Sequence, residues 1–288
     1  MKLEGSIVIE NLKYKDYVIC YLDVLGFSTK VNRSVDCKNS QFDIIGSYLH
    51  TTSTIAKFFE TEDEIDEDLG LKIVVISDSI IITAPIKDLQ NSDELSKAIK
   101  GVSIYAGRLV VMLMKLNYFL RGSVTVGKIY QNKHQIVGPG LISAYKMEED
   151  FAKFPRVILD MSVVKRFYGG DYDKFNRELN RFTYFGVDTN TYIRRTEFWD
   201  TYYQPYFDDC VFLDIFCIIE YFESPFKSTF KRIYDYVLEG TFEMPNIAEK
   251  YWWFLRYLVA RLKGPYVDNS LPFKNKDYEE LIKKYGDV

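Results

Sequence analysis

The sequence predicts an α+β fold built on one mixed sheet, and three observations lead to that prediction. The first is an apolar strand, residues 17–22, that runs into an aspartate and a glycine turn. The second is a pair of short apolar runs within residues 71–84 that only two residues separate. The third is that these strands alternate with two longer segments, 39–60 and 91–117, whose apolar residues recur at helical spacing.

The first strand carries the most informative residue of the chain. Tyr17 to Leu22 are aromatic, β-branched or otherwise apolar, which is typical of a buried strand, and Asp23 follows them directly. A carboxylate at the end of a core strand costs free energy unless a positive charge is bound there. Gly26 then allows the chain to bend closely around whatever Asp23 binds. The interpretation therefore depends on whether a second carboxylate lies nearby.

The next two strands supply that carboxylate. Residues 71–76 and 79–84 indicate a tight hairpin with Asp78 in its two-residue turn. Pro85 is expected to end the second of these strands. With the long helices, the order is that of a βαββαβ, or ferredoxin-like, unit with its helices on one face of the sheet. In such a unit the first strand lies beside the hairpin, so we expect Asp23 and Asp78 to lie close together.

The segments after the hairpin continue the pattern. Asn91 and, three residues later, Glu94 provide the capping residues for the start of the helix expected at 91–117. The elements expected next are strands at 120–126, 128–130 and 135–137, a helix at 141–151 and a strand at 156–159.

The C-terminal part is aromatic and has a mostly helical pattern. Residues 202–222 are partly strand-like, whereas 226–238 and 247–262 have helical spacing. No linker rich in proline, glycine or serine divides the chain. We therefore expect a core of residues 1–165 and a mostly helical extension, residues 166–288, within the same globular unit.

Composition and charge exclude several classes of function. Apolar residues make up 47% of the chain and its net charge is −4, so the basic footprint of a protein that binds duplex nucleic acid is absent. With 2 histidines, any metal ion is expected to be held by oxygen atoms, hence Mg²⁺ or Mn²⁺. The 4 cysteines form no CxxC pair, the start lacks a signal peptide, and no apolar stretch approaches the roughly 20 residues of a membrane span. We expect a cytoplasmic protein without membrane insertion.

Two neighbouring aspartates suit a particular chemistry. They can hold a pair of divalent cations about 3.5–4 Å apart, which is the arrangement used for in-line displacement at phosphorus. The bend after Asp23 also fits, because a turn between a strand and a helix directs backbone N–H groups towards phosphate oxygens. The residues of this bend, which we take as nucleotide-binding candidates, are Val24, Leu25, Gly26, Phe27 and Ser28.

Four motifs also resemble those of a known family. Residues 21–28, Tyr-Leu-Asp-Val-Leu-Gly-Phe-Ser, resemble the first metal motif of class III nucleotide cyclases, and 76–79, Ile-Ser-Asp-Ser, resemble the second. Residues 120–127 resemble the Arg-Gly strand of that family. Residues 138–157 contain a Gly-Pro-x-Leu, Ala-Tyr, Glu and Pro-Arg pattern that is similar to the pyrimidine cyclase branch of antiphage (Pycsar-type) systems. The order of these motifs is more specific than any one of them.

The chain departs from the purine-specific members of that family at four positions. Val74 and Gln135 stand where purine cyclases usually place a lysine and an aspartate or similar group that read the base. Ile142 and Lys146 stand where those enzymes have an asparagine and a transition-state arginine. The missing base-reading pair favours a pyrimidine substrate. Lys146 retains a cation that can stabilise phosphate charge, so we include it among the catalytic candidates.

The resemblance implies a homodimer whose two copies complete each other's sites. It also implies that Asp23, Asp78 and the Val24 carbonyl hold two Mn²⁺ or Mg²⁺ ions while a ribose 3′-hydroxyl attacks the α-phosphorus and pyrophosphate leaves. The expected substrate is UTP, in preference to CTP. The product, 3′,5′-cyclic UMP, would act as a second messenger in antiphage defence by binding a downstream effector.

Three alternatives stay open. The chain can be a nucleotide-binding regulatory domain without turnover, which Ile142 favours, or a purine nucleotide cyclase. It can also be a polymerase-like enzyme, although its acidic charge disfavours binding to nucleic acid.

Three further residues are candidates for contacts with the nucleotide. Tyr48, within the helix predicted at 39–60, can stack on a pyrimidine or serve as a surface or interface tyrosine. Arg121 can bind a phosphate or brace the site. Arg156 can bind the triphosphate or pair with an acid. The sequence leaves both roles open for each of them.

Overall fold

The structure is a computed structural model. It describes residues 13–36, 45–54, 69–132, 135–180, 193–195, 211–222, 226–243, 245–263, 280–281 and 283–285. The elements of its N-terminal part are β1 (Lys15–Val24), α1 (Phe27–Asp36), β2 (Lys72–Ile76), β3 (Ser79–Ile86), α3 (Ser92–Met114), β4 (Leu120–Gln131), β5 (Ile136–Val137), α4 (Pro139–Phe151) and β6 (Val157–Leu159). The elements that follow are α5 (Met161–Tyr168), α6 (Tyr172–Asn180), β7 (Ile193–Arg195), β8 (Val211–Leu213), α7 (Ile215–Phe222), α8 (Phe226–Glu243) and α9 (Pro245–Lys263). Residues 45–54 form a further helical segment between α1 and β2.

The strands form one sheet in the order β2-β3-β1-β4-β6-β8-β7, and β5 pairs with β4 off this path. β1 is antiparallel to both β3 and β4, whereas β4 and β6 run parallel. The predicted α+β fold and βαββαβ order are thereby confirmed, with the β2–β3 hairpin beside β1. β8 and β7, from the C-terminal part of the chain, continue the same sheet.

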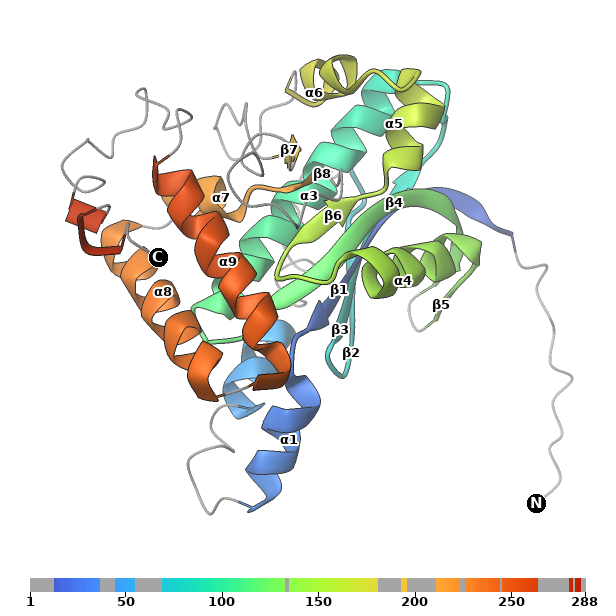
Figure 1. The fold of residues 1–288 in the computed structure, drawn as a ribbon. Coiled ribbons are helices and arrows are strands. Elements are labelled where there is room, and N and C mark those ends of the chain that lie inside the picture. The colour runs from blue at the N-terminus through green and yellow to red at the C-terminus, as the bar shows by residue number, and fades with distance from the viewer. Residues whose placement is uncertain are drawn as a thin grey trace, which may run out of the picture.

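Alternation along β1 gives the sheet two different faces. Cys20 and Leu22 belong to the larger apolar core, against which α3 packs. Ile19 belongs to a smaller cluster on the other face, beneath α4, and the partly buried Tyr21 packs against that cluster. Figure 1 shows α3 and α4 on opposite sides of the sheet. The prediction of helices on one face concerned the βαββαβ part alone, and α4 follows that part in the chain. Asp23 falls on the α4 face, because side chains two residues apart in a strand point the same way.

Helix α3 begins where the capping residues predicted it. The Asn91 side chain accepts hydrogen bonds from the backbone N–H groups of Asp93 and Glu94, which have no partner within the helix itself. The helix is buried along most of its length, since it lies between the sheet and the C-terminal helices.

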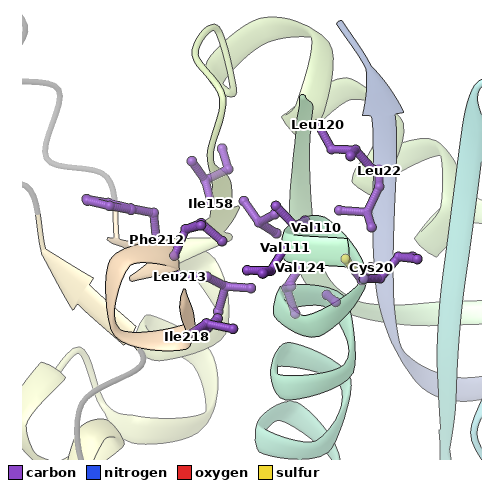
Figure 2. Packing of buried hydrophobic residues seen from close by; sticks show 14 of the residues in the cluster. Cys20, Leu22, Val110, Val111, Leu120, Val124, Ile158, Phe212, Leu213 and Ile218 are labelled. Atoms are coloured by element: carbon purple, nitrogen blue, oxygen red, sulfur yellow. The ribbon is translucent and has the colours of Figure 1, made fainter. Parts of the chain in front are cut away.

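The C-terminal elements pack on the far side of α3. Figure 2 shows Val110 and Val111 of α3 between Cys20 of β1 and Leu213 of β8. Helix α7 also packs closely on α3: a Cβ atom on Gly107 of α3 would lie 2.1 Å from the Cδ1 atom of Ile218 in α7. One continuous core therefore joins the two parts of the chain.

Several elements differ from the prediction. Helix α1 was not predicted, because most of its ten residues are polar. The helix predicted at 39–60 is observed at 45–54, and the rest of it lies outside the described residues. In the segment predicted at 202–222, residues 211–213 form a strand and 215–222 form a helix, while 202–210 also lie outside the described residues.

Strand β3 continues through Pro85 to Ile86, so the expectation that Pro85 ends the strand was wrong. Its pairing with β2 stops at Thr83, so at Pro85 only β1 pairs with it and no N–H group is needed on the other edge. Strand β4 likewise runs unbroken through Gly127. A Cβ atom on Gly127 would lie 2.7 Å from the Cα atom of Gly140 in α4, so this glycine allows the helix to sit close to the sheet.

Among the described residues, no helix is both long enough and apolar enough to cross a membrane.

Candidate functional site

The structure brings Asp23 and Asp78 together at one end of the sheet. Asp23 pairs with Ser79 in the β1–β3 register, and the backbone N–H of Val24 donates a hydrogen bond to the Asp78 carbonyl at 3.2 Å. The Asp23 pKa is raised above its ordinary value, first because the carboxyl is partly buried and further because Asp78 is close; Arg121 opposes the shift. Both aspartates are half-buried. Two carboxylates so placed attract a cation.

The donors at this position fit a hard divalent ion. Mg²⁺ is usually held by one or two carboxylates together with water and substrate phosphates, and the two aspartates provide that number. Among the described residues, no three His, Cys, Asp or Glu side chains gather into a group that could hold a metal ion. Bound phosphate oxygens would therefore have to complete the coordination.

Tyr48 supports the turn that contains Asp78. Its side chain is fully buried, and its hydroxyl donates a hydrogen bond of 2.9 Å to the carbonyl of Ser77. Ser77 has a φ of 56°, which is unusual for a residue other than glycine. The Tyr48 ring packs against Phe27 and Tyr118, with centroids 4.9 and 5.0 Å away. Tyr48 is thus neither a surface tyrosine nor free to stack on a base, because the fold turns it inward to hold the hairpin.

Two of the five bend residues have amide groups that the protein itself uses. The N–H of Val24 donates to Asp78, and that of Leu25 donates to the Phe119 carbonyl at 2.8 Å. Gly26 has a φ of 70° and turns the chain into α1. No hydrogen bond from the amides of Gly26, Phe27 or Ser28 is seen within the described residues, and the first N–H groups of a helix have no partner within it, so these amides suit an anion.

Arg121 lies between two carboxylates. Its Nε atom is 2.6 Å from Oε1 of Glu148 and 3.6 Å from Oδ2 of Asp23. Glu148 projects from α4 and is 2% exposed. Burial raises the pKa of Glu148 to about 7, although the Arg121 charge acts in the opposite direction. Arg121 therefore braces the site in this structure, and its guanidinium stays next to the metal-binding candidate.

Arg156 and Lys146 lie apart from the two aspartates. Arg156 is 1% exposed, and its guanidinium lies over the rings of Phe154 and Trp253 at 5.4 and 5.2 Å. A phosphate could reach it only if these rings moved, so the structure does not support the predicted contact with the triphosphate. Lys146 is exposed on α4, whereas Ala144 and Glu148 of the same helix face the sheet.

Sequence reasoning missed two charged residues of this region. Glu148 belongs to the quoted Ala-Tyr and Glu pattern, and its helical spacing from the buried Ala144 could have placed it on the inner face of α4. Lys250 comes from α9 and lies within electrostatic range of Asp23, Arg121 and Glu148. No local pattern marks it, because only the tertiary fold brings α9 to this end of the sheet.

No protein-family model matches the sequence, and no curated protein matches it either. Among solved structures, the adenylyl cyclase CyaB from P. aeruginosa aligns with a TM-score of 0.37 and 14% identity over 54% of this chain and 82% of that one. A class III adenylyl cyclase-like ATP-binding protein from Pseudomonas aeruginosa gives a TM-score of 0.38 and 15% identity over 58% of this chain and 41% of the other. The guanylyl cyclase domain of the RhoGC fusion protein from the aquatic fungus Blastocladiella emersonii gives 0.36 and 15% over 54% and 86%. Similarity at this level carries no argument about activity.

Proposed function

We propose that the protein is a class III nucleotide cyclase that converts a pyrimidine nucleoside triphosphate, UTP in preference to CTP, into the 3′,5′-cyclic monophosphate and pyrophosphate. The observation that carries the proposal is the position of Asp23 and Asp78 at adjacent strand ends, joined by the backbone hydrogen bond of 3.2 Å from Val24 to Asp78. Each carboxylate disfavours the charge of the other unless a cation lies between them. That arrangement suits phosphoryl chemistry better than a purely structural role.

Asp23, Asp78 and the Val24 carbonyl are the groups that would hold Mn²⁺ or Mg²⁺. When bound, such ions would lower the pKa of the ribose 3′-hydroxyl and neutralise charge on the triphosphate. The free amides at the start of α1 orient phosphate oxygens. Arg121 stays beside Asp23 through its ion pair with Glu148 and keeps a positive charge next to the reacting phosphate.

The choice of a pyrimidine rests on two side chains. Val74 packs on the α4 face of the sheet, which is the face that contains Asp23, and offers no hydrogen-bond donor to a purine. Gln135 is exposed beyond the end of β4, where purine cyclases have a base-reading group by the resemblance described above. Val74 cannot form the hydrogen bond that a lysine at this position would offer, so a purine edge would lose a partner there, which selects against purines.

The exposed side of α4 supports the proposal of a homodimer. Ile142 and Tyr145, three residues apart on this helix, are 56% and 43% exposed and leave apolar surface that a partner could cover. A second copy packed there would bury them and would bring Lys146 to the site of its partner. We propose that Lys146 stabilises phosphate charge across that interface, and that the cyclic product acts on an effector in antiphage defence.

The test is to incubate the full-length protein with each of the four nucleoside triphosphates and Mn²⁺ or Mg²⁺ and to identify products by mass spectrometry. We expect cyclic UMP and pyrophosphate, with no product after the divalent ions are chelated. A cyclic purine product would overturn only the pyrimidine assignment. Absence of any cyclic product with retained nucleotide binding would favour the regulatory alternative and exclude the enzyme.

A further inference from the structure

Helix α9 lies against the bend that contains the phosphate-binding candidates. A Cβ atom placed on Gly26 would lie 3.9 Å from the Cδ1 atom of Ile247, near the start of α9. In Figure 1 the N-terminal end of α9 lies beside the end of β1 and the start of α1. Lys250 follows Ile247 by three residues, so both side chains project from the same side of the helix. The helix thereby directs a lysine towards the Asp23 end of the sheet.

Aromatic packing fixes the position of this lysine. Tyr251 and Phe254 pack on Phe119, with ring centroids 5.4 and 5.6 Å away. Trp253 stacks on Phe154 at 4.9 Å, with the two rings nearly parallel. Phe119 lies two residues before Arg121, so the same contacts hold α9 against the start of β4. These contacts fix the position of α9 relative to the start of β4.

The charges around Lys250 leave room for an anion. Lys250 is half-buried and lies within electrostatic range of Asp23, Glu148 and Arg121. Its pKa is lowered first by burial and next by the charge of Arg121, whereas the carboxylates of Asp23, Glu148 and Glu249 act in the opposite direction. Glu148 and Asp23 both lie next to Arg121, and within the described part of the chain Lys250 forms no ion pair with either of them. A partly desolvated ammonium beside a guanidinium costs free energy unless a further negative charge approaches.

We propose that Lys250 binds the terminal phosphates of the nucleoside triphosphate within the same copy of the chain, an inference that rests on the proposed function for its ligand. The bend of residues 26–28 and the two aspartates surround the phosphates from the sheet side, and α9 closes the site from the other side. An ammonium group is a compact, mobile cation that suits the β- and γ-phosphates, where charge increases as pyrophosphate leaves. The C-terminal extension is then a part of the binding site, and the βαββαβ core alone is incomplete.

The test compares binding of inorganic tripolyphosphate and of UMP to the full-length protein by calorimetry in Mg²⁺ buffer. We expect Lys250→Gln to weaken binding of tripolyphosphate about tenfold, which is the size of one charge-assisted hydrogen bond. Binding of UMP should not change, because it has no β- or γ-phosphate. The matched control is Lys231→Gln, which removes an exposed lysine of α8 and should change neither affinity.

Two further measurements keep the outcome decisive. In the wild-type protein, tripolyphosphate should protect the Lys250 amine from chemical labelling, whether or not the variant folds. A purely structural lysine would instead show a lower melting temperature in Lys250→Gln with unchanged tripolyphosphate affinity and no protection, and that result would overturn the inference. If no triphosphate is cyclised yet Lys250→Gln still weakens tripolyphosphate binding, the proposed function fails and this inference stands.

Discussion

The two faces of the sheet perform different tasks, although the same strands build both. On the α3 face, Val18, Cys20 and Leu22 of β1 are fully buried in one apolar core. On the α4 face, Ile19 is buried, but Tyr21 and Asp23 become progressively more polar towards the strand end. Stability therefore comes mainly from one face, and the candidate chemistry lies on the other.

The difference shows how a folded core can tolerate a reactive site at its edge. Each fully buried aliphatic side chain contributes about 1.5–3 kcal/mol to folding, so the α3 face can offset the cost of partly buried carboxylates on the α4 face. The alternation of a strand separates the two sets of residues without any extra element. Adjacent residues of β1 should consequently respond to substitution in opposite ways.

The largest effect is expected at the α4 face. Asp23→Asn or Asp78→Asn should lower the cyclase rate roughly a thousandfold, since ion-assisted charge stabilisation contributes several kcal/mol to the transition state. For Asp23→Asn, the free energy of unfolding in the absence of metal should stay the same or rise, because burial and the neighbouring Asp78 disfavour the Asp23 charge more than Arg121 favours it. Steady-state kinetics and urea unfolding measure the two quantities. Asp150→Asn, at an exposed position of α4, is the control. Retained activity in either variant would contradict the two-ion site.

The neighbouring residue on the α3 face should show the reverse. Leu22→Ala removes a fully buried side chain and should lower the free energy of unfolding by about 2–5 kcal/mol, because the cavity left behind cannot collapse completely. Below its melting temperature, the variant should keep its kcat and KM. If urea unfolding instead showed no loss of stability, the assignment of the stabilising face would be wrong.

A smaller effect is expected at Tyr48, which packs in the core and supports the turn that contains Asp78. Tyr48→Phe removes the hydrogen bond to the Ser77 carbonyl and should cost about 1 kcal/mol of stability. It should also raise the Mn²⁺ concentration needed for half-maximal activity, because the turn that holds Asp78 becomes less rigid. Titration of activity against Mn²⁺ tests this positioning role. Tyr14→Phe, at an exposed tyrosine, should leave the titration unchanged, and an equal shift in both variants would argue against the role.

The smallest effect concerns pH. The folded-state pKa of Glu148 is about 7, above its ordinary value of 4.5, so the folded protein holds a proton that the unfolded chain has released between these values. The contribution of Glu148 to stability therefore decreases as pH rises through this interval and is constant above it. Relative to the wild type without metal, Glu148→Gln should gain stability as the pH rises from 5 to 8, because only the wild-type folded protein has to release the proton of Glu148 in this range. Thermal unfolding across this range would contradict the assignment if the difference between the two proteins stayed constant.

Local patterns were sufficient for the central elements. The apolar run before Asp23, the two-residue turn at Asp78 and the cap at Asn91 each depend on neighbouring residues, and the structure places β1, the β2–β3 hairpin and α3 accordingly. Known rules of strand order then brought the two aspartates together. For that reason the candidate site for two divalent cations could be predicted from the sequence.

The partners of the other site residues depended on segments far away in the chain. The orientation of Tyr48 follows from its packing on Tyr118, and that of Arg156 from Trp253 of α9. Arg121 lies beside both Asp23 and Glu148 because helix α4, which carries Glu148, packs across strands β1 and β4.

The sequence by itself determined the strand, the turn and the two carboxylates, because hydrophobic period and turn chemistry act between near neighbours. Tertiary structure alone decided which cations surround them. Lys250 reaches the site only because aromatic packing lays α9 across the end of the sheet. Such contacts depend on the shape of the assembled core, which no local pattern contains.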